Sequence, residues 1–259
     1  MRAFAIFVVS LVTLAAIPAT AAEPRIALVV GNNKYTSGPR PLNNAVPDAE
    51  LIGRELAGAG FDVDTVPNAG WKDLSAAVTR FASRLKHAGP GAVGVFYFAG
   101  HGLQHQGTNY LLPTDAAVED PDHLSEAGYD ATRVLWAMQD GGARTMIVIL
   151  DACRRNAFPK TSRPVTEQGL AEFNTKALDK KRSIFIAYST GADETAADGE
   201  KDEGNGPFAT VLAENIRVPG QEIDDMFMQV RLQMVENFDQ KPWQTNGMLH
   251  SFAFVGQAR

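Results

Sequence analysis

The chain has 259 residues, of which 45% are hydrophobic and 21% charged, a composition typical of one large globular domain or two small ones. A formal net charge of −6 argues against a general nucleic-acid-binding surface, which needs clustered positive charge. The chain contains one cysteine, Cys153, so it cannot form an intramolecular disulfide.

The first 22 residues have the pattern of a secretory signal. Arg2 provides a basic start, an apolar stretch covers 3–17, and a small-residue site of the Ala-x-Ala type ends at Ala21. The alternative is an uncleaved membrane anchor, but the apolar stretch is short for a bilayer span. We therefore expect an exported protein, periplasmic or secreted, in which residues 23–259 form a single domain without a membrane span.

Apolar patterning along the rest of the chain predicts strands and helices in alternation. Apolar runs bounded by turn residues indicate strands, and apolar residues repeating every three to four positions indicate helices. The predicted strands are 25–31, 61–66, 93–102, 109–113, 145–153, 182–189 and 251–255. The predicted helices are 43–57, 71–85, 131–139, 207–216 and 223–238. This alternation favours an α/β fold with a largely parallel sheet and helices on both faces.

One stretch, 157–181, matches neither pattern. It contains Pro159, Pro164, Gly169 and several basic residues, and it is predicted to be a long exposed loop. Loops of this length inside a compact domain are usually functional or disordered.

Two of the predicted buried strands end in residues that carry chemistry. One strand runs into Gly100-His101-Gly102, and another ends at Cys153, two residues after Asp151. Because active sites of open parallel sheets lie at the carboxyl ends of strands, the imidazole and the thiol are expected to meet there. An imidazole can take the proton of a thiol and so produce a nucleophilic thiolate. The alternative is a cysteine that serves only as a small buried apolar side chain.

Several segments together resemble the caspase-like cysteine peptidases, particularly the bacterial metacaspase-type proteins. The histidine precedes the cysteine by 52 residues, and the cysteine lies in Asp151-Ala152-Cys153-Arg154. The other matching segments are 97–102, 187–190, 27–32 and 42–49. The resemblance covers nearly the whole of the chain after the signal.

This resemblance implies a three-layer sandwich with a mostly parallel central sheet of about six strands. It also implies a cysteine endopeptidase in which Cys153 attacks the scissile carbonyl and His101 transfers the proton to the leaving amine. The backbone N–H groups of Gly102 and Cys153 are then expected to bind the oxyanion.

The resemblance also bears on specificity for the residue before the scissile bond, P1. Where animal caspases carry arginines that select aspartate, this chain has Leu42, close to Arg40, and Asp198. The acids of metacaspase pockets match Asp48 and Asp151, so we expect Asp48, Asp151 and Asp198 to bind an Arg or Lys side chain at P1. Alternatively, Asp48 is a first-turn acid that stabilises its helix, and Asp151 satisfies backbone groups at the strand end.

Metacaspases often need calcium, but the cluster of Glu119, Asp120 and Asp122 has the spacing of no calcium loop. We therefore expect no cofactor in the site, and calcium activation stays open as an alternative. The expected partners are protein or peptide substrates with a basic P1 residue. Caspases dimerise through their last strand, here 251–255, whereas metacaspases are commonly monomeric, so a monomer or weak dimer is expected.

An enzyme that cleaves after basic residues could cleave its own chain in the 157–181 loop, which contains several of them. A solvated charged loop accounts for these basic residues equally well. These residues are Lys160, Arg163, Lys176, Lys180 and Lys181. Two other functions remain as alternatives. One is a catalytically silent caspase-like module that binds proteins. The other is a hydrolase using Ser189, which lacks the first glycine of the G-x-S-x-G motif.

Overall fold

The structure is a computed structural model that describes residues 23–37, 39–118, 123–153, 170–190 and 204–257. The predicted signal, the acidic cluster at 119–122 and Asp198 lie outside these residues.

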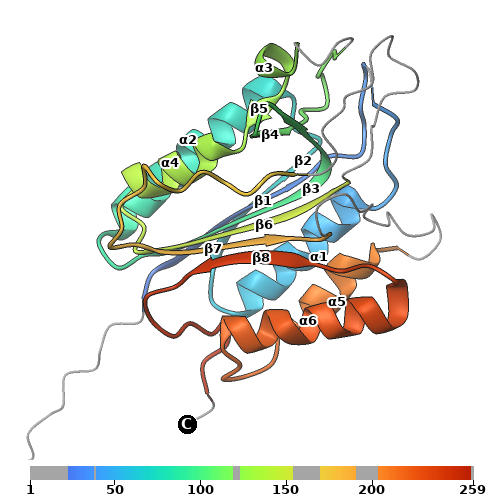
Figure 1. Ribbon diagram of the computed structural model, residues 1–259. Helices are drawn as coiled ribbons and strands as arrows, with labels where there is room; N and C mark the ends of the chain where they lie inside the picture. Colours follow the sequence, from blue (N-terminus) through green and yellow to red (C-terminus); the bar gives the residue numbers. More distant parts are fainter. Residues whose placement is uncertain (1–22, 38, 119–122, 154–169, 191–203, 258–259) are drawn as a thin grey trace, which may run out of the picture.

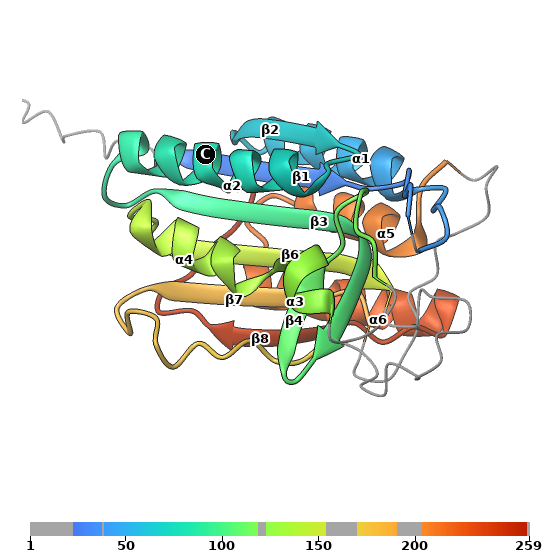
Figure 2. The same ribbon diagram turned by 90° about the horizontal axis from the view of Figure 1, so that it is seen from above.

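A single sheet forms the centre of the molecule, with strand order β2-β1-β3-β6-β7-β8 (Figures 1 and 2). The first five strands of this order are parallel to one another, and β8 pairs antiparallel with β7 at one edge. The strands are β1 (Arg25–Gly31), β2 (Asp62–Pro67), β3 (Val93–His105), β6 (Thr145–Cys153), β7 (Ser183–Tyr188) and β8 (Trp243–Gly247). Two short strands, β4 (Thr108–Leu111) and β5 (Tyr129–Asp130), extend from β3.

Helices cover both faces of the sheet and complete a three-layer sandwich (Figure 1). One face carries α2 (Trp71–Ala88) and α4 (Thr132–Asp140), and the other carries α1 (Ala45–Gly58), α5 (Pro207–Ile216) and α6 (Ile223–Phe238). The remaining helix, α3 (Leu124–Ala127), is a single turn beside the β4 hairpin. The predicted α/β class and mostly parallel sheet are confirmed.

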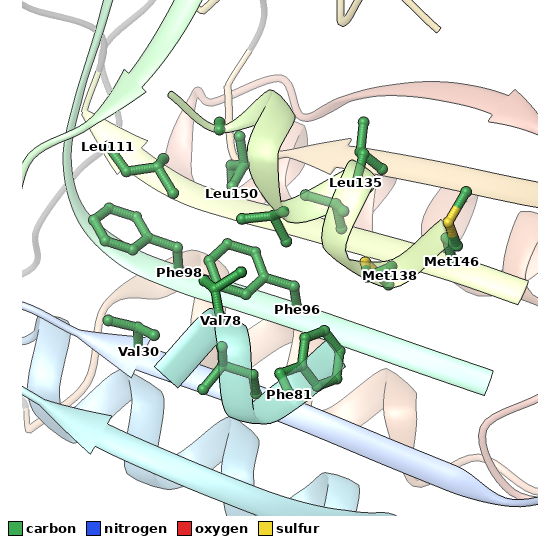
Figure 3. Close-up of a cluster of buried hydrophobic side chains, with 14 of the residues drawn as sticks. Val30, Val78, Phe81, Phe96, Phe98, Leu111, Leu135, Met138, Met146 and Leu150 are labelled. Atoms are coloured by element: carbon green, nitrogen blue, oxygen red, sulfur yellow. The ribbon is translucent and has the colours of Figure 1, made fainter. Parts of the chain in front are cut away.

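Two apolar cores, one on each face, hold the layers together. Side chains alternate along β3, so Phe96 and Phe98 face α2 and α4, whereas Val95 and Tyr97 face α1 and α5. Figure 3 shows Phe96 and Phe98 among the helix residues of the first core. All four side chains are fully buried, and removing each phenylalanine from water contributes about 2 kcal/mol to stability. Because both faces are buried, the strand reads in the sequence as one continuous apolar run.

The strand that carries His101 is longer than predicted. Beyond the sheet it bends away and pairs antiparallel with β4, from Gly102 opposite Leu111 to His105 opposite Thr108 (Figure 2). The connecting residues Gln106 and Gly107 both have positive φ, as in a two-residue hairpin turn. His101 is therefore placed where β3 leaves one sheet neighbour and joins another, and not at a free strand end.

The prediction for the last strand is wrong. The sheet is completed by Trp243–Gly247, whereas residues 251–255 form only isolated bridges, Ala253 with Glu222 and Val255 with Pro219. The alternating apolar pattern of 251–255 arises because Phe252 and Phe254 are buried in the core beside α1, α5 and α6. β8 rather than 251–255 is therefore the edge strand on this side of the sheet, and β2 forms the other edge.

The described part of the predicted 157–181 loop, residues 170–181, has no strand or helix and is exposed over most of its length. Three of its side chains, Leu170, Phe173 and Leu178, are nevertheless buried in the core beneath α2 and α4. Asn109 fixes this segment through two hydrogen bonds with the backbone of Ala171, of 2.6 and 2.7 Å.

Candidate active site

The sheet register brings the predicted catalytic positions together. His101 on β3 and Cys153 on β6 are register partners in neighbouring parallel strands. Neighbouring strands lie about 4.8 Å apart, so two residues separated by 52 positions in sequence have adjacent backbones. This is the spatial proximity that a cysteine–histidine pair requires.

The His101 ring is buried and held from two sides. Its Nε2 lies 2.8 Å from the Arg40 carbonyl oxygen, and its ring packs against Tyr35 with centroids 4.7 Å apart. The Tyr35 hydroxyl also accepts a hydrogen bond of 2.8 Å from the His101 backbone N–H. A carbonyl can only accept, so the Arg40 contact places the proton on Nε2 and makes Nδ1 the basic nitrogen of the neutral ring.

Close packing explains the two glycines around His101. A Cβ at Gly100 would lie 2.8 Å from both Phe98 Cζ and Tyr35 Oη, and one at Gly102 would lie 3.0 Å from Ala152 Cβ. Any larger residue would push apart β3 and the elements that hold His101.

The backbone N–H of Gly102 is directed toward β6 rather than toward the β4 hairpin. Leu112 N–H donates to the His101 carbonyl at 2.9 Å, so Gly102 and Leu111 form a non-hydrogen-bonded antiparallel pair. The Gly102 N–H therefore points away from β4.

A buried tyrosine connects two of the predicted acids on the α1 face of the sheet. Tyr97 donates a hydrogen bond of 2.9 Å to Asp151 Oδ2. Burial raises the pKa of Tyr97 well above its ordinary value, and the charges of Asp151 and then Asp48 raise this pKa further. Both carboxylates therefore lie close enough to act on one phenol, which concentrates negative charge at this end of the sheet.

Asp48 also has a structural role. It lies in the first turn of α1, and its Oδ1 accepts hydrogen bonds from Gly206 N–H at 2.7 Å and Asn205 Nδ2 at 3.0 Å, just before α5. Asp48 thus ties the starts of two helices together beside Asp151. The helix-stabilising and charge-presenting interpretations of this residue are compatible.

The remaining predicted residues are placed as follows. Leu42 is half-buried and packs against the core, whereas the Arg40 side chain is exposed. Ser189 is 1% exposed at the end of β7. The Arg40 carbonyl and Tyr35 could not be predicted, because a backbone carbonyl leaves no mark in a sequence and an isolated tyrosine in a loop carries no signal. Tyr97 lay inside a matched segment, where its apolar neighbours suggested packing alone.

Two further observations concern the described residues alone. No group of three or more His, Cys, Asp or Glu side chains comes together there in a way that could hold a metal ion. Within the same ranges, no helix combines the length and the apolar character needed to cross a bilayer.

Comparisons with known proteins agree with this architecture. Residues 24–254 match the family model described as a caspase domain. Caspase-1 from Spodoptera frugiperda has a similar crystal structure, with a TM-score of 0.64, 15% identity and 91% coverage of each chain. A protein from Geobacter sulfurreducens gives a TM-score of 0.61 at 19% identity, covering 91% of this chain and 95% of that one. These two similarities concern the fold.

Similarity in sequence extends to two mammalian proteins. Human mucosa-associated lymphoid tissue lymphoma translocation protein 1 is 28% identical over 170 residues, which cover 65% of this chain and 19% of the human protein. Its mouse homologue is 28% identical over 170 residues, covering 65% of this chain and 18% of the mouse protein. The matched region is about a fifth of the length of these relatives.

Proposed function

This chain belongs to the caspase domain family, and on that premise we propose that it is a cysteine endopeptidase with Cys153 as nucleophile and His101 as proton carrier. The observation that carries the proposal is the register pairing of these two positions across β3 and β6. The fixed orientation of the imidazole supports it, because a general base must be held within reach of the proton that it removes.

In the proposed reaction, His101 Nδ1 takes the thiol proton and the Cys153 thiolate attacks the scissile carbonyl carbon. The oxyanion accepts hydrogen bonds from the backbone N–H groups of Gly102 and Cys153, each typically worth about 10²–10³ in kcat. His101 then gives its proton to the leaving amine, and water hydrolyses the thioester with His101 again acting as base. The Arg40 carbonyl stabilises the imidazolium form, because it accepts a hydrogen bond from Nε2–H throughout the reaction.

We propose that the preferred P1 residue is Arg or Lys. The common action of Asp151 and Asp48 on Tyr97 supports this specificity, because two carboxylates near one phenol form a negative region beside the catalytic pair. A guanidinium can bind a carboxylate through two parallel hydrogen bonds, and an ammonium through a point charge. Asp198 remains a proposed member of this pocket and lies outside the described residues.

Peptide cleavage by the purified protein tests both proposals. Matched fluorogenic peptides that differ only in P1 Arg, Lys or Asp are compared on wild type, Cys153→Ala and His101→Ala. We expect cleavage of the Arg and Lys peptides by wild type alone. Activity that survives Cys153→Ala would rule out the mechanism, and faster cleavage of the Asp peptide would rule out the acidic pocket. A wild type that cleaves nothing would favour the silent binding module.

The export of the protein, the lack of a cofactor in its site, with calcium activation left open, and its monomeric or weakly dimeric state are further parts of the proposal. Cell fractionation, activity measured with a calcium chelator, and sedimentation analysis test them in turn.

Self-cleavage, if it accompanies this function, is restricted by the packing of the chain around residue 175. Lys176, Lys180 and Lys181 are exposed, but the buried side chains of Phe173 and Leu178 fix the backbone around Lys176. The other two candidate sites, Lys160 and Arg163, lie outside the described residues. Intact-mass analysis should show fragments ending at one of these residues in wild type and an unbroken chain in Cys153→Ala.

A further inference from the structure

The side-chain hydroxyl of Ser189, just beyond the end of β7, is buried. Ser189 is 1% exposed, and within the described part of the chain its Oγ has no hydrogen-bond partner. Buried polar side-chain atoms are usually paired, because an unmade hydrogen bond in a water-excluded place is costly. A hydroxyl kept in this state suggests that its partner is a molecule that binds.

The backbone of Ser189, in contrast, is firmly held. Its N–H donates to the Leu150 carbonyl at 2.9 Å, which continues the β6–β7 pairing by one residue. Its carbonyl accepts a hydrogen bond of 2.7 Å from Nε2 of Gln240, a residue that is itself 3% exposed. The hydroxyl is therefore presented from a fixed position rather than from a loose loop.

The register places this hydroxyl beside the acidic group. The β6–β7 pairing ends at Leu150 and Tyr188, and Ser189 N–H still donates to the Leu150 carbonyl, so Asp151 and Ser189 are the next residues along the two strands. Side chains alternate along a strand, and Ala187 faces the α1 side, so Ser189 faces that side too. Tyr97 binds Asp151 from the same face. Ser189 is thus a neutral acceptor next to the carboxylate proposed to bind P1.

We propose that Ser189 is a specificity-determining residue whose Oγ accepts a hydrogen bond from the cationic side chain of P1. This inference rests on the proposed function, since it assigns a further contact in the same pocket. A guanidinium carries five N–H donors in a fixed fork, more than one bidentate carboxylate can accept. Ser189 Oγ accepts a hydrogen bond from a guanidinium N–H that is directed away from Asp151. The bound substrate thereby gives the buried hydroxyl the hydrogen-bond partner that it lacks among the described residues.

The first experiment compares peptides with P1 arginine and P1 norleucine, which lacks the cation. Ser189→Ala should lower kcat/KM for the arginine peptide about tenfold, mainly through KM, and leave the norleucine peptide unchanged. Thr190→Val is the matched control: Thr190 is 0% exposed, its Oγ1 is also without a partner in the described part of the chain, and alternation turns it to the opposite face. The control should change neither peptide's kinetics.

An equal loss on both peptides in Ser189→Ala would overturn the inference, because it would indicate a structural defect. Equal kinetics of Ser189→Ala and wild type on the arginine peptide would overturn it as well.

A second experiment separates this inference from the proposed catalysis. Benzamidine, a planar amidinium, is titrated calorimetrically into Cys153→Ala and into Cys153→Ala with Ser189→Ala, neither of which needs turnover. The second protein should bind about tenfold more weakly, and identical dissociation constants or undetectable binding to Cys153→Ala would overturn the inference. If binding weakens as expected but wild type cleaves no peptide, the proposed function fails while the Ser189 contact stands.

Discussion

The two ends of the central sheet use polar side chains in opposite ways. At the amino ends of the parallel strands, the guanidinium of Arg25 donates to the carbonyls of Ala59, Ala253 and Phe254. It also lies 5.4 Å from the ring centroid of Phe61. At the carboxyl ends, the imidazole, carboxylates and hydroxyl of the candidate site are gathered into one region.

A second polar group at the amino end has the same character. The ring of His250 bridges two buried hydroxyls, at 3.1 Å from Thr145 Oγ1 and 3.0 Å from Ser183 Oγ. At the amino end, polar side chains form hydrogen bonds between distant parts of the chain, which increases stability. At the other end the polar groups His101, Asp48 and Asp151 belong to the proposed active site. Mutations should therefore affect stability at one end and activity at the other.

The largest effect is expected for the catalytic pair. Cys153→Ala and His101→Ala should each lower kcat/KM by at least about 10³-fold, because one removes the nucleophile and the other the proton carrier. The thermal unfolding midpoint of Cys153→Ala should stay close to that of wild type. If that midpoint fell as far as it does for a core substitution, the assignment of stability to one end of the sheet and activity to the other would be wrong.

A smaller loss is expected for Asp151→Asn, which keeps the shape of the side chain and removes its charge. Cleavage after Arg should fall about 10²-fold, as for a buried charge pair that loses one partner. The pKa of Tyr97 should also move down toward its ordinary value, because Asp151 is one of the charges that raise it. Spectrophotometric titration of the phenols measures this shift, and an unchanged titration would show that Asp151 does not act on Tyr97.

The reverse pattern is expected at the amino end. Arg25→Ala should reduce the free energy of unfolding by about 2 kcal/mol, because hydrogen bonds from a charged donor to three carbonyls are lost. Peptide cleavage by the folded variant should match wild type. Denaturant unfolding and steady-state kinetics on one preparation test this pair of expectations, and a tenfold loss of activity would show that the ends are coupled.

The smallest effect is expected for Ser183→Ala. Its Oγ accepts a hydrogen bond of 3.0 Å from Leu249 N–H and contacts His250, so its removal should cost about 1 kcal/mol of stability. Activity should be unchanged. Ser189→Ala is the informative counterpart, because it removes a serine hydroxyl beyond the other end of β7. It should lower cleavage after Arg and leave stability unchanged.

The pH dependence of stability provides a further check. The pKa of Tyr97 is raised in the folded state, so the stability it contributes is present below the unfolded tyrosine pKa of about 10. That contribution is lost as the pH rises from there through the folded pKa. Unfolding free energies measured across this alkaline range should fall more steeply for wild type than for Tyr97→Phe.

The sequence predicted those parts of the fold whose residues are buried on a regular pattern. β3 and β6 were recognised because both of their faces are covered, and the catalytic pair followed from where these strands end. β8 was missed because Trp243–Gly247 is a partly exposed edge strand of mostly polar residues, without a buried pattern. Phe252 and Phe254 looked like a strand because burial alone produces the same alternation.

The site was predictable in its side chains and not in its backbone contacts. Asp48 and Asp151 were identified by resemblance, but their common relation to Tyr97 depends on tertiary packing between α1, β3 and β6. Nothing in the sequence indicates which backbone carbonyl of the loop between β1 and α1 contacts His101; in the structure it is that of Arg40. The environment of Ser189 depends on Gln240, which is 51 residues away.

The division of the catalytic pair between β3 and β6 has a consequence for timing. The two strands are parallel, so they can pair only after the hairpin, α3 and the α4 crossover have been made and folded. A chain that is only partly synthesised or folded does not have positions 101 and 153 paired. Assembly of the sheet therefore precedes the proposed activity, which should appear in refolding experiments no earlier than the pairing of these two strands.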